Sequence, residues 1–132
     1  GLHAHESYLQ RHGTPTELEQ LREHHLIGYD QETPLIRALQ AHGLPLKRAM
    51  FALRTDNDIA QLSAIRAGFG IGVCQVGLAR RDPSLRRVLT KALHLSLDTY
   101  VVMHEDLRQV GRYRIVFDAL VAGLRDYHAS QR

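Results

Sequence analysis

The sequence predicts an α/β domain in which helices cover a parallel or mixed β-sheet. Apolar segments of strand character alternate with segments of helical periodicity along the 132 residues. Residues 51–75 also contain a strand, a polar turn, a helix and a glycine-rich entry into a second strand. That order is a βαβ unit, and its first strand–helix junction is a position where open α/β sheets bind ligands.

The N-terminal elements follow from their termination signals. We expect an extended entry at 2–5, helices at 6–12 and 16–24, a strand at 26–29 and a helix at 34–42. Gly13 and Gly43 end two of these helices, because glycine readily adopts the left-handed backbone at a helix C-terminus. Thr16 suits an N-cap, and Pro34 suits the first position of a helix.

The remaining elements alternate in type until a long C-terminal helix. We expect strands at 49–53, 71–74, 85–89 and 99–103, helices at 56–67, 76–81 and 111–128, and an irregular segment at 91–98. The last helix is amphipathic, with Ile115, Leu120, Val121 and Leu124 inward and Arg112, Arg125 and Asp126 outward.

Composition favours one globular domain of a protein that stays in the cytoplasm. The chain has 44% hydrophobic residues and a formal charge of +3, which is weak evidence for nucleic-acid binding. A single cysteine, Cys74, allows no intrachain disulfide. Since no apolar run reaches the roughly 20 residues of a membrane helix and no signal segment opens the chain, we expect no membrane partner.

The glycine-rich segment Ala67-Gly-Phe-Gly-Ile-Gly72 is interpreted as structural. A dinucleotide fingerprint needs glycines after a strand and before a helix, and here the order is reversed. We therefore expect Gly68 to end a helix in the left-handed conformation and Gly70 and Gly72 to permit close backbone packing.

The turn formed by Arg54, Thr55, Asp56 and Asn57 is the candidate site. Thr55 or Asp56 is placed to cap the following helix, and capping could be the whole role of the turn. Alternatively, its hydroxyl, amide and N–H groups hold a small polar or anionic ligand. The charge of Asp56 disfavours a bare anion and suits a ligand that carries both an amine and an acid group.

Catalysis and metal binding have little support in the sequence. His3 and His5 would face one side of a strand, yet no third ligand follows at zinc-site spacing. A G-x-S-x-G elbow and a P-loop are missing from the sequence, and Cys74 suits a buried hydrophobic position better than a nucleophile. We expect no enzyme activity, no metal and no cofactor.

Five ordered segments resemble the effector-binding domain of LysR-type transcriptional regulators. They are residues 2–15 with Tyr8-Leu-Gln-Arg-His-Gly-Thr-Pro15, residues 16–27, residues 51–73, Pro83-Ser-Leu85, and residues 100–108 followed by 112–120. The resemblance implies a periplasmic-binding-protein-like fold of two lobes with a small effector, such as an amino acid or small carboxylate, between them.

The resemblance also implies how the chain is divided. Residues 1–103 would form the second lobe, and residues 104–132 would be the return segment and closing helix of the first. The helix-turn-helix that reads DNA would be absent, as would the front of the first lobe. DNA contact would need this missing part. The resemblance further implies that the complete regulator is a homo-oligomer, a dimer or a tetramer. The helix at 111–128 would lack its sheet, which predicts exposed apolar surface and self-association.

Site residues follow from the resemblance by position. Thr55, Asp56 and Asn57 match the turn from which the second lobe contacts effector, with Arg54 and Gln75 as further candidates. The sequence leaves one alternative to the regulator, which is a stand-alone solute-binding protein or an enzyme on the same α/β scaffold.

Overall fold

The computed structural model describes residues 1–41, 43, 46–93, 96 and 98–129. The chain forms two compact units, residues 1–95 and residues 96–132. Each unit is described by itself.

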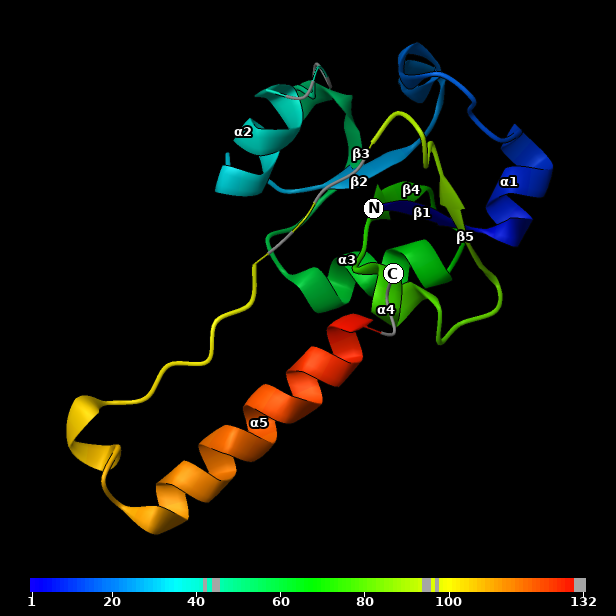
Figure 1. Cartoon of the computed structure of the whole chain (residues 1–132). Coiled ribbons are helices and arrows are strands. Elements are labelled where there is room, and N and C mark those ends of the chain that lie inside the picture. Colours follow the sequence, from blue (N-terminus) through cyan, green and yellow to red (C-terminus); the bar gives the residue numbers. More distant parts are fainter. Residues whose placement is uncertain (42, 44–45, 94–95, 97, 130–132) are drawn as a thin grey trace. The chain divides into compact units, whose positions relative to one another are not determined.

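The first unit is built on a mixed sheet of five strands (Figure 1). The strands are β1 (Leu2–His5), β2 (Leu26–Gly28), β3 (Phe51–Arg54), β4 (Ile71–Val73) and β5 (Leu85–Val88), in the order β3-β2-β4-β1-β5. β2 pairs in parallel with both β3 and β4, whereas β1 pairs antiparallel with β4 and β5. The mixed sheet flanked by helices that the sequence predicts is thereby confirmed.

Helices connect these strands close to the predicted positions. They are α1 (Glu6–His12), α2 (Pro34–Ala41), α3 (Asp58–Arg66) and α4 (Val76–Ala79), with short 3-10 helices η1 (Leu18–Glu23) and η2 (Arg48–Met50). The predicted strand at 49–53 therefore begins two residues late, because η2 occupies its start. The predicted end of α2 at His42 lies outside the described residues.

The helix predicted at 16–24 differs in its type and its cap. It is the 3-10 helix η1, and Glu17 rather than Thr16 occupies the N-cap position. Gln20 explains the difference, because its Oε1 accepts the backbone N–H groups of Thr16 at 2.7 Å and of Glu17 at 3.2 Å. The bond from Glu17, together with the one from the Gln20 N–H to the Glu17 side chain, forms a capping box one residue later than the sequence predicted.

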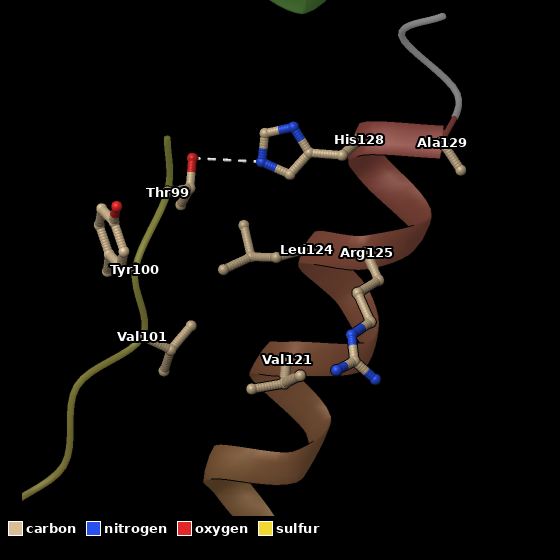
Figure 2. A pocket seen from close by; sticks show the side chains of 8 residues that line it. All are labelled: Thr99, Tyr100, Val101, Val121, Leu124, Arg125, His128 and Ala129. Carbon is tan, nitrogen blue, oxygen red and sulfur yellow. Dashed lines mark hydrogen bonds between the residues drawn. The ribbon is translucent and has the colours of Figure 1, made fainter. Parts of the chain in front are cut away.

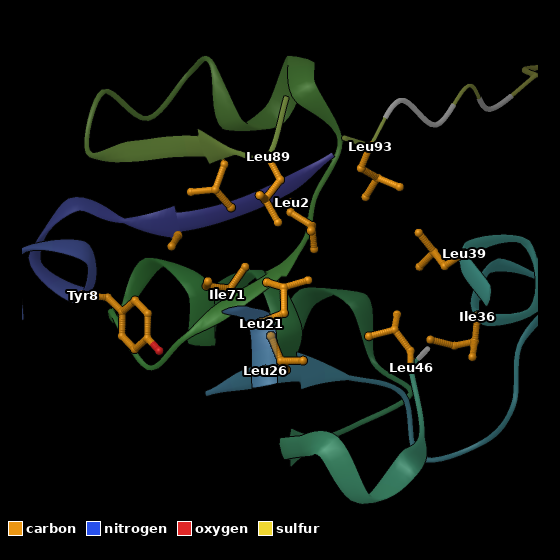
Figure 3. Packing of buried hydrophobic residues seen from close by; sticks show 12 residues of the cluster. Leu2, Tyr8, Leu21, Leu26, Ile36, Leu39, Leu46, Ile71, Leu89 and Leu93 are labelled. Carbon is orange, nitrogen blue, oxygen red and sulfur yellow. The ribbon is translucent and has the colours of Figure 1, made fainter. Parts of the chain in front are cut away.

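Alternate residues of the strands supply two apolar layers, one on each face of the sheet. Leu26 packs with α1, α2 and η1, whereas its neighbour Ile27 packs with α3 and α4. Figure 3 shows the larger layer, which contains Leu2, Ala4, Tyr8, Leu21, Leu26, Ile36, Leu39, Leu46, Ile71, Val88, Leu89 and Leu93. This packing fixes the positions of the strand ends, where the candidate site lies.

The structural interpretation of the glycine-rich segment is confirmed. Gly68 follows α3 with φ +70° in the left-handed region. A Cβ at Gly70 would overlap the backbone carbonyl of His25, and a Cβ at Gly72 would press on Ile65. The segment therefore lets α3 and β4 approach the rest of the sheet closely.

The second unit contains α5 (Gly111–Ala129) and the 3-10 helix η3 (Glu105–Leu107). The strand predicted at 99–103 is wrong, because these residues pair with no described strand. No side chain of α5 is buried, and Ile115 is 72% exposed. The inward placement of Ile115 and Leu120 is therefore wrong, while the predicted exposed apolar surface is confirmed.

Candidate functional site

The carboxyl ends of three parallel strands meet at one edge of the sheet. β3 ends at Arg54, β2 at Gly28 and β4 at Val73; a polar turn follows β3 and β2, and Cys74 and Gln75 follow β4. Figure 1 shows β2 between its two neighbours, in the order that the sheet prescribes. In open α/β sheets this edge is where ligands bind. We call it the carboxyl edge.

Thr55 stands at the end of β3 with its backbone fixed from two sides. Its N–H donates to the carbonyl of Gly28 at 3.0 Å, which extends the pairing of β2 and β3 by one bond. Its own carbonyl accepts from Nε2 of Gln61 at 2.7 Å, and Gln61 is only 2% exposed. The Thr55 hydroxyl oxygen accepts the N–H of Asn57 at 3.3 Å and still has a proton to donate.

Asn57 caps α3, so the prediction that Thr55 or Asp56 caps it is wrong. Oδ1 of Asn57 accepts the N–H groups of Ile59 at 2.9 Å and Ala60 at 3.0 Å. The helix begins at Asp58, two residues later than expected, which moves the N-cap to Asn57. Because the cap occupies these two N–H groups, they are not open to an anionic ligand.

Asp56 instead binds the neighbouring turn. Its Oδ1 accepts the backbone N–H groups of Asp30 at 2.9 Å and Gln31 at 3.1 Å. These residues follow β2, so Asp56 joins the turn after β3 to the turn after β2. Hydrogen bonds to an ionised acceptor are stronger than those between neutral groups.

Arg54 belongs to an ion-pair group that includes a second arginine. Oδ1 of Asp30 lies 3.7 Å from Nε of Arg54 and 2.6 Å from a terminal nitrogen of Arg48. Nε of Arg48 also donates to the backbone carbonyl of Asp30 at 3.1 Å. Both guanidinium groups therefore share one carboxylate at the carboxyl edge.

Tyr29 adds a hydroxyl to the same place. It donates to Oδ1 of Asp58 at 2.9 Å. Burial is the largest cause that raises the pKa of Tyr29 to about 12, and the hydrogen bond to Asp58 and the negative charges of Asp58 and Asp56 act in the same direction. The hydroxyl is therefore protonated, and a donor, throughout the neutral range.

The sequence analysis missed Tyr29, Asp30 and Arg48. A signal for the first two was present, since they directly follow the apolar run that forms β2. In a parallel sheet the residues after adjacent strands meet at one edge. Arg48 carried no such signal, because it comes before β3 and reaches Asp30 only through the folded chain.

Gln75 lies at the same edge but apart from the other candidates. It is exposed and precedes α4, and its backbone carbonyl accepts from Leu78 and Ala79. Since β2 lies between β3 and β4, about 10 Å of sheet separates the ends of β3 and β4. In the described part of the chain, no hydrogen bond or ion pair connects Gln75 to Arg54, Thr55, Asp56 or Asn57.

Cys74 and His5 have structural roles. Burial is the main cause that raises the pKa of the Cys74 thiol, which lies in the apolar layer under α3 and α4. Nδ1 of His5 accepts the N–H of Ser7 as the cap of α1.

Among the described residues, no three histidine, cysteine, aspartate or glutamate side chains are grouped as a metal site would require. No described helix is long and apolar enough to cross a membrane.

The second unit has a groove of its own, shown in Figure 2. The extended residues Thr99, Tyr100 and Val101 form one wall, and α5 forms the other with Val121, Leu124, Arg125, His128 and Ala129. Its volume is about 780 Å³. Nε2 of His128 and the hydroxyl of Thr99 lie 3.2 Å apart across one end. None of the predicted site residues lines this groove.

A solved structure shares this fold. The regulatory domain of CrgA, a LysR-type transcriptional regulator from Neisseria meningitidis, superposes with a TM-score of 0.65 at 20% sequence identity. The alignment covers 93% of this chain but only 63% of that one. No curated protein sequence matched the chain.

A family profile assigns the chain directly. The profile described as the LysR substrate binding domain matches residues 2–125. That range contains the whole sheet, the carboxyl edge and most of α5. The mixed sheet flanked by helices is the periplasmic-binding-protein-like fold of this family. This chain belongs to the LysR substrate binding domain family, the effector-binding domain of LysR-type regulators.

Proposed function

We propose that this chain senses a small molecule for a LysR-type transcriptional regulator. The observation that carries the proposal is the carboxyl edge of a domain of this family, where Arg54, Thr55, Tyr29 and Asp30 place charges and hydroxyl groups side by side. Control of transcription, oligomer formation and DNA contact through a helix-turn-helix belong to the complete regulator.

The effector in this proposal carries an acid group and an amine. Arg54 and Arg48 offer guanidinium donors to a carboxylate, and Asp30 offers a counter-charge to an ammonium group. The Thr55 hydroxyl has a proton to donate to the effector. Asn57 lies at the end of the same turn, and Gln75 lies at the far end of the carboxyl edge. Amino acids and small carboxylates are therefore the compounds to test first.

The proposal includes a division of the chain between two lobes. Residues 1–103 would be the second lobe, and residues 104–132 would return to the first lobe. The compact units divide after residue 95, near that boundary. An effector between two lobes would contact this chain on one side only.

A thermal-shift screen of the complete regulator and of the 132-residue chain tests the proposal. A compound at 100 times its Kd stabilises a protein by about 2.7 kcal/mol, which raises Tm measurably. We expect an amino acid or a small carboxylate to raise Tm of the complete regulator, with a weaker effect on the chain. An equal effect on both would favour a stand-alone solute-binding protein.

Thr55→Ala tests the site in the complete regulator. Loss of one hydrogen bond to a ligand costs about 0.5–1.5 kcal/mol, so Kd of the compound found in the screen should rise about two- to tenfold. Thr14→Ala is the matched control, since Thr14 is exposed and lies outside the carboxyl edge. Unchanged affinity in Thr55→Ala would remove Thr55 from the site.

A further inference from the structure

We infer that Asp56 is a positioning residue which holds the turn after β2 in place, so that Tyr29 and Asp30 contribute to effector binding at the carboxyl edge. This inference rests on the proposed function and changes the role of one candidate. In it, Asp56 acts through hydrogen bonds to the backbone, and its charge is not a ligand contact.

The two bonds of Asp56 define the position of this turn. Its Oδ1 accepts from the N–H groups of Asp30 and Gln31, two consecutive residues that lie beyond the last pair of β2 and β3. The bond from Thr55 N–H to Gly28 ends the pairing of the two strands. Asp56 therefore continues the attachment of the β2 side past the point where sheet hydrogen bonds stop.

The position of the turn determines where the side chain of Asp30 lies. Asp56 fixes the backbone of Asp30, and the Asp30 carboxylate then reaches Arg48 and Arg54. Side chains of Asp30 and Arg54 are 44% and 39% exposed, so both are accessible to a ligand. If the turn moved, Arg54 would lose the carboxylate that orients its guanidinium group.

Tyr29 is held from both sides by the same arrangement. It precedes the clamped residue Asp30, and its hydroxyl donates to Asp58 in the first turn of α3. Asp56 and Asp58 thus connect the turn after β2 to the start of α3 by independent bonds. A ligand bound at Arg54 and Thr55 would meet Tyr29 and Asp30 in a fixed geometry, which lowers the entropy cost of binding.

Two substitutions separate geometry from charge. Asp56→Asn keeps an oxygen acceptor at the same position and removes the charge, whereas Asp56→Glu keeps the charge and moves the acceptor by one methylene. Asp56→Ala removes both. Asp82→Ala is the matched control. Asp82 also accepts a backbone N–H, that of Ser84, but it precedes β5, which is the last strand of the sheet on the side away from β3.

The first readout is hydrogen exchange of the Asp30 and Gln31 amides in the 132-residue chain, measured by NMR. We expect at least tenfold faster exchange in Asp56→Ala and clearly faster exchange in Asp56→Glu. Asp56→Asn should stay within about threefold of the native rate, and Asp82→Ala should not differ from it. Faster exchange in Asp56→Asn with native rates in Asp56→Glu would overturn the inference, because charge would then be the active property.

The second readout is the rate at which a guanidinium-specific dicarbonyl, p-hydroxyphenylglyoxal, modifies Arg54, located by peptide mass spectrometry. Asp56→Ala and Asp56→Glu should raise this rate several-fold, as Asp30→Ala does, while Asp56→Asn and Asp82→Ala leave it unchanged. Altered amide exchange with an unaltered Arg54 rate would overturn the positioning role. Neither readout needs an effector, so failure here is distinct from failure of the ligand screen.

Discussion

Single residues of the first unit have pKa values that make its stability depend on pH. His3 is 2% exposed, and its Nδ1 lies 2.9 Å from the carbonyl oxygen of Gly1. Burial is the largest cause that lowers the pKa of His3 from 6.5 to about 4, and the Gly1 ammonium and Arg87 act in the same direction. The folded chain therefore keeps His3 neutral where the unfolded chain already protonates it.

This difference predicts the sign of a measurable effect. As pH falls from about 6.5 to 4, the unfolded state binds the proton first, so the free energy of unfolding decreases. We expect a loss of about 1–2 kcal/mol between pH 7.5 and pH 5, measured by urea denaturation. His3→Gln should reduce this loss, because glutamine does not titrate in this range. An undiminished loss in His3→Gln would contradict the assignment.

A second residue-scale prediction concerns Tyr8, which is 1% exposed. Its hydroxyl accepts the N–H of His25 at 2.8 Å and lies 3.1 Å from Nδ1 of His24. Tyr8→Phe leaves both groups without this partner, and because His24 is half-buried and His25 is exposed, the loss should be that of an ordinary hydrogen bond, about 0.5–1.5 kcal/mol. We expect the free energy of unfolding to fall by that amount in urea titrations. Tyr113→Phe on the exposed face of α5 should cost nothing measurable.

At the residue scale the sequence predicted the position of the turn at 54–57 better than the hydrogen bonds that its residues make. Arg54, Thr55, Asp56 and Asn57 lie where a strand–helix junction was expected. Three neighbouring side chains could each have capped α3, and only the register of the first helical turn decides for Asn57. The bonds of Asp56 to a turn 25 and 26 residues away depend on tertiary structure, which local patterns do not encode.

At the scale of elements, a predicted strand formed only where the chain contains another strand that pairs with it. The βαβ unit at 51–75 buries Ile65, Ile71 and Cys74 within the first unit and forms within about two residues of the predicted bounds, although Ile59 of α3 is 76% exposed. Residues 99–103 have strand-forming side chains but no strand to pair with among the described residues, and Val102 is 87% exposed. A strand requires a neighbour for its hydrogen bonds, whereas α5 satisfies its own and forms without burial.

Gly70 provides a prediction at this scale, because it sets how closely β4 approaches β2. A Cβ there would overlap the carbonyl oxygen of His25, which accepts the N–H of Ile71 at 2.8 Å. Gly70→Ala must displace this strand junction, and overpacking of this kind costs about 1–3 kcal/mol. Gly123→Ala is the control, since nothing lies within 4 Å of its Cβ position and alanine favours helix. Equal stability of the two variants would contradict the close approach.

At the scale of the whole molecule, the buried residues that the structure describes all belong to the first unit. Both apolar layers lie between Leu2 and Leu93, inside the first unit, whereas α5 contributes no buried side chain. Hydrophobic burial is the main favourable term in folding, so the sheet unit should contain nearly all of the stability. Within the second unit, the apolar face of α5 leaves Ile115, Val116 and Leu120 more than half exposed.

Removal of the second unit tests this division. A chain of residues 1–95 should unfold cooperatively with a urea midpoint close to that of the 132-residue chain, because it retains both apolar layers and all five strands. It should also associate less at high concentration in light scattering, since the exposed apolar residues of α5 are gone. Amide exchange in the longer chain should agree, with α5 exchanging faster than β2 and β4. A large fall in the midpoint of the shorter chain would show instead that residues 96–132 stabilise the sheet unit, and that its stability depends on the return segment.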